Sequence, residues 1–416
     1  MDKNFRLARV AAGLLIAAAR IPAAAQGSDF SAPKEIKPML KIQWRLSQDY
    51  PMGIQDSAVG YLGGKIVSAG GFTRHPLGIL AHHPDAFGGQ PSGFTKTTFA
   101  LDPAREELGW QRITDVPGPA RQGPAVAVVG NAMYVMGGIN YDDPYTYRDT
   151  YQLRFADDQW TWTKLESCTL PWPVYGAAAS TAVIGDRIYL FGVADFFRAP
   201  DAQGADFHSE SGREGSPVSK ALLVLDTQDL SSGWKRLADC PGLPLFDAGV
   251  AAAGGKIWRL GGIYAPVRKQ GELWRGENPY YNAVESWVYD PATDRWSRLG
   301  DMPHGSNRRA IAWQDRYVIL IAGYKYPLTW LSDGTRTEAY SAEEKDQPWQ
   351  EHFEKTVLVY DTQTGQLGTA DSLIERTSYP SSTIVGDTIY CLGGEGGPRL
   401  WHPATLQIGR IEGRVP

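Results

Sequence analysis

The sequence predicts an all-β fold: a six-bladed β-propeller with four antiparallel strands in each blade, with seven blades as the alternative. Two observations predict it. A short hairpin motif is written six times along the 416 residues, and a strand–turn–strand motif follows each copy. One four-stranded sheet cannot bury both of its faces alone, whereas sheets stacked radially bury each other's faces and leave few free edges.

The clearest copy of the hairpin motif is RQGPAVAVVGNAMYVMGG at residues 121–138. Its apolar runs at 126–129 and 133–136 are joined through a Gly-Asn pair. Two short apolar runs joined by such a turn are typical of a β-hairpin. A glycine pair closes the second run, which indicates a backbone turn that would crowd a Cβ atom.

Five further copies repeat this order. Counting all six, the first glycine-pair position falls at 70, 137, 192, 261, 322 and 393, a spacing of 55 to 71 residues. Two copies depart from the pair, with Gly192-Val193 and Ala322-Gly323. The five further copies occupy residues 57–71, 180–193, 249–262, 310–323 and 382–394.

The second motif is a strand ending in Asp, a polar turn, and a short strand near a tryptophan, as in WVYDPATDRWSRL. Asp-Pro or Asp-Thr followed by polar residues is turn chemistry. The tryptophans recur at one register, so we expect them to pack between neighbouring sheets. They are Trp110, Trp162, Trp234 and Trp296, and Leu367 takes their place in the sixth copy. The two motifs together resemble the kelch repeat of β-propellers over nearly all of the mature chain.

Residues 1–25 have a basic start, an apolar stretch and a small-residue Ala-Ala-Ala end. This pattern predicts a secretory signal peptide, so we expect a secreted or periplasmic protein after its cleavage. Residues 26–40 are expected to be a flexible leader, and residues 41–416 a single propeller domain.

Two segments could supply the outer strand that closes the ring. Residues 41–47 carry Trp44 and precede the first hairpin by the usual distance, and residues 401–411 also have a strand pattern. Only one of them can occupy the outer position, and we favour 41–47.

Composition narrows the classes of function. The formal net charge is −5 with no basic stripe, which argues against a nucleic-acid partner. No run of 18 or more apolar residues follows the N-terminal segment, so no membrane span is expected.

Cys168 and Cys240 hold the same place in successive repeats, and Cys391 lies in an apolar strand. We therefore expect three buried thiols without a disulfide. The sequence specifies no oligomeric state.

The segments after the glycine pairs are long, while the hairpin turns are tight. They leave the same end of the second strand in every blade, so we expect them to wall a central depression on one face. The long segments are residues 72–96, 194–219, 263–283 and 324–353. The side chains at the strand starts on this face are Gln55, Asp56, Arg121, Gln122, Tyr175, Phe246, Asp247, Asn307, Arg308, Ser378 and Tyr379. Those after the second strands are Phe72, Asn140, Tyr141, Asp195, Tyr264, Tyr324, Tyr326 and Glu395.

This rim is rich in tyrosine, arginine and acidic groups. Tyrosine rings stack on sugar faces, and arginine holds a carboxylate through two hydrogen bonds. We therefore expect a carbohydrate partner, acidic polysaccharide included. The predicted substrate-binding residues are Arg121, Arg308, Tyr141, Tyr264, Tyr324, Tyr379 and Glu395. The histidines lack the spacing of metal ligands, so neither a metal nor a cofactor is expected.

Segments such as GPARQG and GGINYDDPYTYRDTYQL resemble the ulvan-lyase-like propellers, a secreted group. The resemblance implies a polysaccharide lyase that abstracts the C5 proton of a uronic acid and expels the 4-linked sugar by β-elimination. It implies Tyr175 as the base or acid, and Arg121 or Arg308 as the group that neutralises the uronate. Arg121-Gln122 stands where the family has a histidine, so His75 or His208 would have to take that role.

The six repeats are also similar to the N-acetylneuraminate epimerase-like kelch propellers. That resemblance implies mutarotation of a sugar acid, which needs an acid and a base on opposite sides of the anomeric centre and an arginine for the carboxylate. Asp247, Glu395 and Arg308 could supply them. We place β-elimination first, mutarotation second, and a non-catalytic glycan- or protein-binding propeller third, because a fold alone does not choose among functions. The predicted catalytic residues are Tyr175, His75 and Asp247.

Overall fold

The computed structural model describes residues 36–73, 93–140, 146–174, 180–191, 196–198, 207–209, 220–245, 247–264, 280–305, 307–396 and 403–415. The predicted signal peptide lies outside these residues, and so do the predicted site residues His75, Tyr141 and Tyr175.

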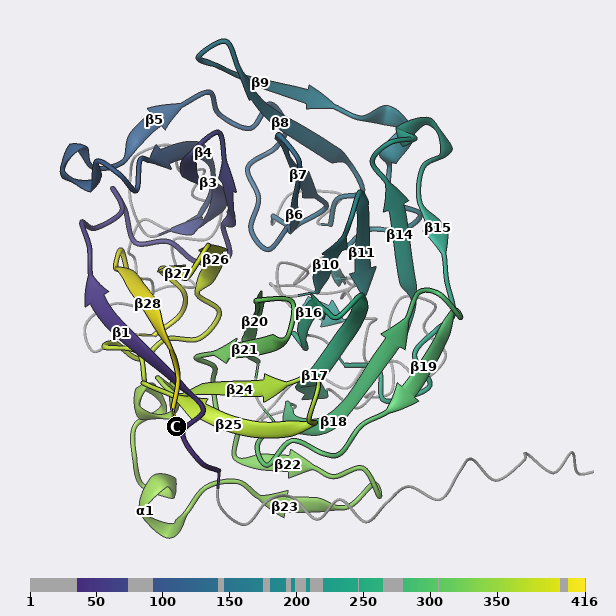
Figure 1. Ribbon diagram of the computed structural model, residues 1–416, viewed down its shortest axis with the longest axis vertical. Helices are drawn as coiled ribbons and strands as arrows, with labels where there is room; N and C mark the ends of the chain where they lie inside the picture. Colours follow the sequence, from purple (N-terminus) through teal and green to yellow (C-terminus); the bar gives the residue numbers. More distant parts are fainter. Residues whose placement is uncertain are drawn as a thin grey trace, which may run out of the picture. The chain divides into compact units, whose positions relative to one another are not determined.

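The described residues form an all-β propeller whose hairpins follow the repeats of the sequence, as predicted (Figure 1). Sheet 1 contains β2 (Ala58–Leu62), β3 (Lys65–Thr73), β4 (Gly93–Leu101) and β5 (Gln111–Ile113). Sheet 2 contains β6 (Ala125–Val129), β7 (Ala132–Met136), β8 (Thr150–Ala156) and β9 (Gln159–Lys164). Sheet 3 contains β10 (Thr181–Ile184), β11 (Arg187–Phe191), β14 (Leu222–Asp226) and β15 (Lys235–Arg236).

Three more sheets continue the order. Sheet 4 contains β16 (Gly249–Ala253), β17 (Lys256–Tyr264), β18 (Tyr281–Asp290) and β19 (Arg295–Arg298), extended by β22 (Leu328–Trp330) and β23 (Arg336–Glu338). Sheet 5 contains β20 (Arg309–Trp313), β21 (Tyr317–Ile321), β24 (Val357–Asp361) and β25 (Gln366–Ala370). Sheet 6 contains β26 (Ser381–Val385), β27 (Thr388–Leu392), β28 (Leu406–Arg414) and β1 (Leu40–Leu46).

The remaining elements are short. The strands β12 (Phe196–Arg198) and β13 (Phe207–Ser209) form a separate pair. The one α-helix of the described ranges is α1 (Ala342–Lys345), and single 3-10 turns lie at Glu106–Leu108, Glu166–Cys168, Leu230–Ser232 and Trp349–His352. Within the part of the chain that the structure describes, no helix has the length and apolar character that a bilayer span requires.

The first strand of each sheet faces the centre of the ring. These strands contact one another in the order β2, β6, β10, β16, β20 and β26, and β26 contacts β2 again. In Figure 1 the fourth strands β9, β15, β19, β25 and β1 lie at the periphery. Residues at the start of any first strand are therefore brought toward a common axis.

The N-terminal strand closes the last sheet, as predicted for residues 41–47. β1 pairs with β28 in antiparallel register, with Gln43 opposite Arg410. The other candidate segment supplies β28, the third strand, because it follows the β26–β27 hairpin in the way that third strands follow the hairpins of the other sheets. The ring is therefore held shut by β1, whose Ile42 amide donates to Asp371 Oδ2 of the neighbouring sheet at 2.8 Å.

The tryptophans pack between neighbouring sheets, also as predicted. Trp110, Trp162, Trp234 and Trp296 each lie in an apolar cluster shared by two sheets, as does Trp44 of β1. The Trp110 indole has no hydrogen-bond partner among the described atoms, whereas the other four Nε1 groups donate to a backbone carbonyl of the preceding sheet or of the segment that follows it. These bonds are Trp162 to Thr114 at 2.9 Å, Trp234 to Cys168 at 3.0 Å, Trp296 to Ala238 at 2.8 Å and Trp44 to Asp371 at 2.8 Å. Leu367 packs in the cluster between sheets 4 and 5.

The glycine pairs follow the second strands of sheets 2 and 6 directly, and in sheets 1 and 4 they form a bulge within β3 and β17. Gly137 and Gly393 have φ of 64° and 58°. A Cβ atom at Gly393 would lie 2.1 Å from the carbonyl oxygen of Ile54. Ala322 keeps the same turn with a φ of 60°, although it departs from the glycine pattern. The three cysteines, Cys168, Cys240 and Cys391, are buried and free, as predicted.

Candidate functional site

Three carboxylates converge on the axis. Asp56 and Asp247 each lie two residues before a first strand, and Glu395 lies three residues after β27. Asp56 and Asp247 are 7% and 9% exposed. Their charges act on one another: the negative charges of Asp56 and Glu395 help burial to raise the pKa of Asp247. We name these three carboxylates and Arg309 the axial cluster.

A side-chain amide links two of the carboxylates. Gln55 Nε2 donates to Asp56 Oδ2 at 3.2 Å and to Glu395 Oε1 at 2.7 Å. The two acceptor oxygens therefore lie at most about 6 Å apart. Gln122 Nε2, from sheet 2, also donates to Asp56 Oδ2, at 3.1 Å. Two backbone bonds between Ser378 and Glu395, at 2.7 and 2.9 Å, fix the position of Glu395 at the end of sheet 6.

The third carboxylate is tied to sheets 5 and 6 through Asn307. The side chain of Asn307 hydrogen-bonds Asp247 and donates to Ser378 Oγ at 3.1 Å. Its Oδ1 accepts from the backbone amide of Tyr324 at 2.6 Å. The polar network thus runs from sheet 2 through sheets 1, 6 and 5 to sheet 4, so the inner ends of five sheets hold the carboxylates in place.

Arg309 is the cation of the axial cluster. It is the first residue of β20 and is 3% exposed. Its Nε donates to the carbonyl oxygen of Pro380 at 3.1 Å, and its Nη1 has no hydrogen-bond partner among the described atoms. Burial lowers the pKa of Arg309, while its positive charge lowers the pKa values of Asp56 and Asp247. Arg309 therefore offsets part of the negative charge of the carboxylates.

The carboxylates are poised to exchange protons near neutral pH. Burial raises the pKa of Asp56 to about 6. Burial, and then the charge of Asp56, raises the pKa of Glu395 to about 7. A pair of neighbouring acids whose pKa values lie near neutrality suits general acid–base catalysis, because one can be ionised while the other is protonated.

Tyrosines border the cluster on one side. The rings of Tyr280 and Tyr326 lie 5.5 Å apart, and those of Tyr324 and Tyr326 lie 4.9 Å apart. Burial, with the charges of Asp247 and Glu395, raises the pKa of Tyr280 to about 12, which places its hydroxyl beside the carboxylates. The aromatic side is anchored where Asn282 Nδ2 donates to the Tyr326 carbonyl oxygen at 2.7 Å and Asn282 Oδ1 accepts from the Tyr326 amide at 2.9 Å.

The structure brings some of the predicted site residues together. Asp247 and Glu395 meet in the axial cluster, and Tyr324 borders it. Tyr379 holds the repeat position of Asp56, with φ of 54°, and its buried hydroxyl has no partner among the described atoms. Tyr264 instead packs edge-on against Trp330 of β22, at 4.9 Å between ring centroids.

The two predicted arginines form ion pairs within their own sheets. Arg121 is 1% exposed and pairs with Asp149 at 2.5 Å. Arg308 is 2% exposed and pairs with Glu354 at 2.5 Å. Each also donates to a carbonyl of the glycine-pair turn, that of Gly137 or of Ala322. Both guanidinium groups thus form their ion pairs within the packed sheets.

Sequence reasoning missed Arg309 and Tyr280. Arg309 opens a first strand whose other copies begin with small residues, Ala58 and Ala125 among them. A charged residue at a position that the repeat fills with small side chains was the signal that could have found Arg309.

The described ranges contain no group of three or more His, Cys, Asp or Glu side chains arranged to hold a metal ion.

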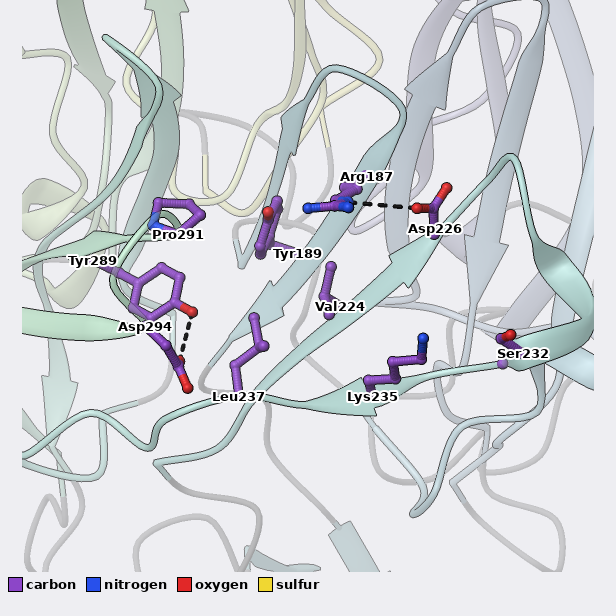
Figure 2. A pocket seen from close by; sticks show the side chains of 11 residues that line it. Arg187, Tyr189, Val224, Asp226, Ser232, Lys235, Leu237, Tyr289, Pro291 and Asp294 are labelled. Carbon is purple, nitrogen blue, oxygen red and sulfur yellow. Dashed lines mark hydrogen bonds and ion pairs between the residues drawn. The ribbon is translucent and has the colours of Figure 1, made fainter.

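A hollow lies on the outer wall, between sheets 3 and 4 (Figure 2). It has a volume of about 260 Å³. Three of its charged groups have partners within the wall: Arg187 Nε lies 3.4 Å from Asp226, and the Tyr289 hydroxyl donates to Asp294 at 2.7 Å. The axial cluster is the stronger candidate site, because its titratable groups are held together by elements from five sheets.

Comparisons with known proteins agree with the fold. A family model described as the KLHDC2/KLHL20/DRC7 Kelch-repeats domain matches residues 79–323. The chain is 24% identical to Kelch-like protein 15 of Danio rerio over 228 residues, which are 55% of this chain and 34% of that protein. The chain thus spans about a third of the length of the first curated relatives it matches.

Two further similarities concern a bacterial protein and a solved structure. The chain is 23% identical to the N-acetylneuraminate epimerase of Yersinia pestis (strain Pestoides F) over 305 residues, 73% of this chain and 62% of that protein. The solved structure described as "Structure of YjhT" matches with a TM-score of 0.57 and 14% identity, covering 88% of this chain and 96% of that one. The similarity to this solved structure shows the fold alone.

Proposed function

The chain belongs to the family of the KLHDC2/KLHL20/DRC7 Kelch-repeats domain, and from that premise we propose that its axial cluster exchanges the anomers of a reducing sugar. The observation that carries the proposal is the sharing of one amide nitrogen, Gln55 Nε2, by Asp56 and Glu395. The Gln55 amide holds two carboxyl groups, one to act as acid and one as base, at a separation that a sugar ring can bridge. Similarity to N-acetylneuraminate epimerases over 62% of their length supports sugar acid–base chemistry in this fold.

The reaction needs two proton transfers, one at each of the two oxygens bonded to the anomeric carbon. Ionised Asp56 accepts the proton of the anomeric hydroxyl while protonated Glu395 donates a proton to the ring oxygen. The bond between the anomeric carbon and the ring oxygen breaks, and the open aldehyde or ketone forms. Rotation about the neighbouring bond and the reverse transfers close the ring as the other anomer, so both side chains regain their starting protonation. Asp247 and Arg309 set the charge around the pair.

The β-elimination placed first from the sequence depends on Tyr175 and His75, which lie outside the described residues. It also needs a cation for the uronate, and both Arg121 and Arg308 are ion-paired within their own sheets. Mutarotation uses groups that the structure brings together, so we place it first.

The test is the anomer exchange of a panel of reducing sugars, measured by exchange NMR with the protein at catalytic concentration. We expect at least one sugar to equilibrate faster than in buffer, and Glu395→Gln to abolish the acceleration. In parallel, uronate polysaccharides are followed by the ultraviolet absorbance of an unsaturated uronic acid. A rise in that absorbance would replace mutarotation with β-elimination, and saturable glycan binding without either reaction would indicate a binding propeller.

We also propose that the protein is exported. The basic, apolar and small-residue pattern of residues 1–25 supports cleavage before Gln26. Cell fractionation followed by N-terminal sequencing of the protein in the cytoplasmic and exported fractions tests this. A mature chain that begins at Gln26 supports it, and a chain that still begins at Met1 contradicts it.

A further inference from the structure

The charge of the axial cluster bears on which sugars it takes. The cluster places three carboxylates, Asp56, Asp247 and Glu395, around the position where a ligand would meet the acid–base pair. The described cation there is Arg309, which is 3% exposed. Its charge lowers the pKa values of Asp56 and Asp247, and its Nη1, which has no partner among the described atoms, is buried, so it offers a ligand no exposed cation.

The neutral donors of the cluster are directed at the same carboxylates. Gln55 and Gln122 both donate their side-chain amides to Asp56, and Gln55 donates to Glu395 as well. Asn307 hydrogen-bonds Asp247. An anionic ligand entering this network would have to compete for donors that already serve fixed carboxylates, and it would meet like charge at short range.

The same arrangement favours ligands that donate hydrogen bonds. Carboxylate and amide oxygens accept hydrogen bonds from sugar hydroxyls and, more strongly, from an ammonium group. The neighbouring rings of Tyr280 and Tyr326 add aromatic faces, which attract both sugar C–H groups and cations.

From these contacts we infer that the axial site takes reducing sugars without a carboxylate, and that a free amino sugar binds best. This inference rests on the proposed function for the location of the site. It departs from the sugar-acid ligand expected from the sequence, because the arginines expected to hold a ligand carboxylate are paired with Asp149 and Glu354.

The experiment compares three ligands that share one ring: glucosamine, glucose and glucuronate, with the galactose series as a second set. Calorimetry at pH 8 measures the dissociation constants, and exchange NMR measures the anomer rates separately. We expect the order glucosamine, glucose, glucuronate from tightest to weakest. The first and last should differ by roughly tenfold to hundredfold, since opposite and like charges act at the same short distance.

Two variants test whether the preference for glucosamine over glucuronate arises at the axial cluster. Glu395→Gln should reduce the preference for glucosamine over glucuronate several-fold, because it removes a carboxylate whose pKa of about 7 leaves it ionised at pH 8. Asp226→Asn removes a carboxylate from the outer wall and should leave the preference unchanged. Far-ultraviolet circular dichroism confirms that both variants keep the fold.

The outcomes separate this inference from the proposed function. Glucosamine binding with the expected order but without accelerated exchange supports the inference and contradicts mutarotation. Accelerated exchange of glucuronate, with glucuronate bound more tightly than glucose, overturns the inference and leaves mutarotation standing. Failure of all six sugars to bind at tens of millimolar overturns the inference, because the site would then take no simple sugar of either class.

Discussion

Asp56 and Asp247 occupy the same position in two different repeats. Each lies two residues before the first strand of its sheet, and their φ angles are 51° and 53°. Gly123 holds this position in sheet 2 with a φ of 58°. Asp adopts the left-handed conformation more readily than most residues. The repeat therefore dictates one backbone shape at the axis, and the side chain placed on it decides the local chemistry.

The proposed acid and base predict a bell-shaped dependence of anomer exchange on pH. Asp56, with a pKa of about 6, must be ionised, so the rate should rise as the pH passes about 6. Glu395, with a pKa of about 7, must be protonated, so the rate should fall above about 7. Asp56→Asn and Glu395→Gln should each lower the rate by about 10²- to 10⁴-fold. Exchange NMR across pH 5 to 9 checks this, and a flat profile would exclude this acid–base pair.

The same carboxylates predict a stability that declines with rising pH. Asp56 and Glu395 bind protons more tightly in the folded state than at their ordinary pKa values of 3.8 and 4.5. Between about pH 4 and 7 the folded protein therefore holds more protons than the unfolded chain, and the free energy of unfolding falls as the pH rises. The loss should be on the order of 4 to 5 kcal/mol for the two groups together. Urea unfolding at pH 5 and pH 8 measures it, and Glu395→Gln should make the decline shallower. An equal decline in that variant would show that other groups cause it.

The glycine-pair turns predict a sharp contrast between two glycines of sheet 6. Gly393→Ala would place a Cβ atom 2.1 Å from the carbonyl oxygen of Ile54, while at Gly386, in the hairpin turn, no atom lies within 4 Å of it. Both glycines have left-handed φ values, 58° and 57°, so both variants carry the same backbone penalty of about 1 kcal/mol. Gly393→Ala should therefore cost at least about 2 kcal/mol more in thermal or urea unfolding. Equal costs would mean that Ile54 moves aside freely.

Closure of the ring by β1 predicts that a substitution near the N-terminus destabilises the whole ring. Ile42 is 2% exposed in the cluster between sheets 5 and 6, so Ile42→Ala should cost about 2 to 5 kcal/mol. Lys41→Ala is the matched control, because the Lys41 side chain is 67% exposed and an ion pair in solvent, such as the one with Glu412, contributes little to stability. Calorimetric melting temperatures compare the two. Similar melting temperatures would mean that β1 is dispensable.

The sequence was sufficient to predict the fold because every repeat carries its own turn and packing signals. The hairpins, the glycine-pair turns, the tryptophans between sheets and the closing strand at 41–47 all follow from local patterns. These features depend on contacts within a repeat or between adjacent repeats, and the regular spacing fixes both.

The site was predicted only in part, because the direction of a side chain at a strand start depends on its partners. Asp247 and Glu395 were chosen from their repeat positions, and the structure brings them together. Arg121 and Arg308 were chosen on the same ground, yet each turns to a carboxylate of its own sheet, Asp149 or Glu354. Those acidic partners lie 28 and 46 residues further along the chain, so spacing alone could not reveal the pairs.

The most direct measurement is a crystal structure of the protein with a sugar whose anomers it exchanges. The account predicts that the anomeric carbon lies between Asp56 and Glu395, with the anomeric hydroxyl or the ring oxygen within hydrogen-bond distance of each. Density for the sugar in the outer hollow beside Arg187 and Asp226, with the axis empty, would contradict it.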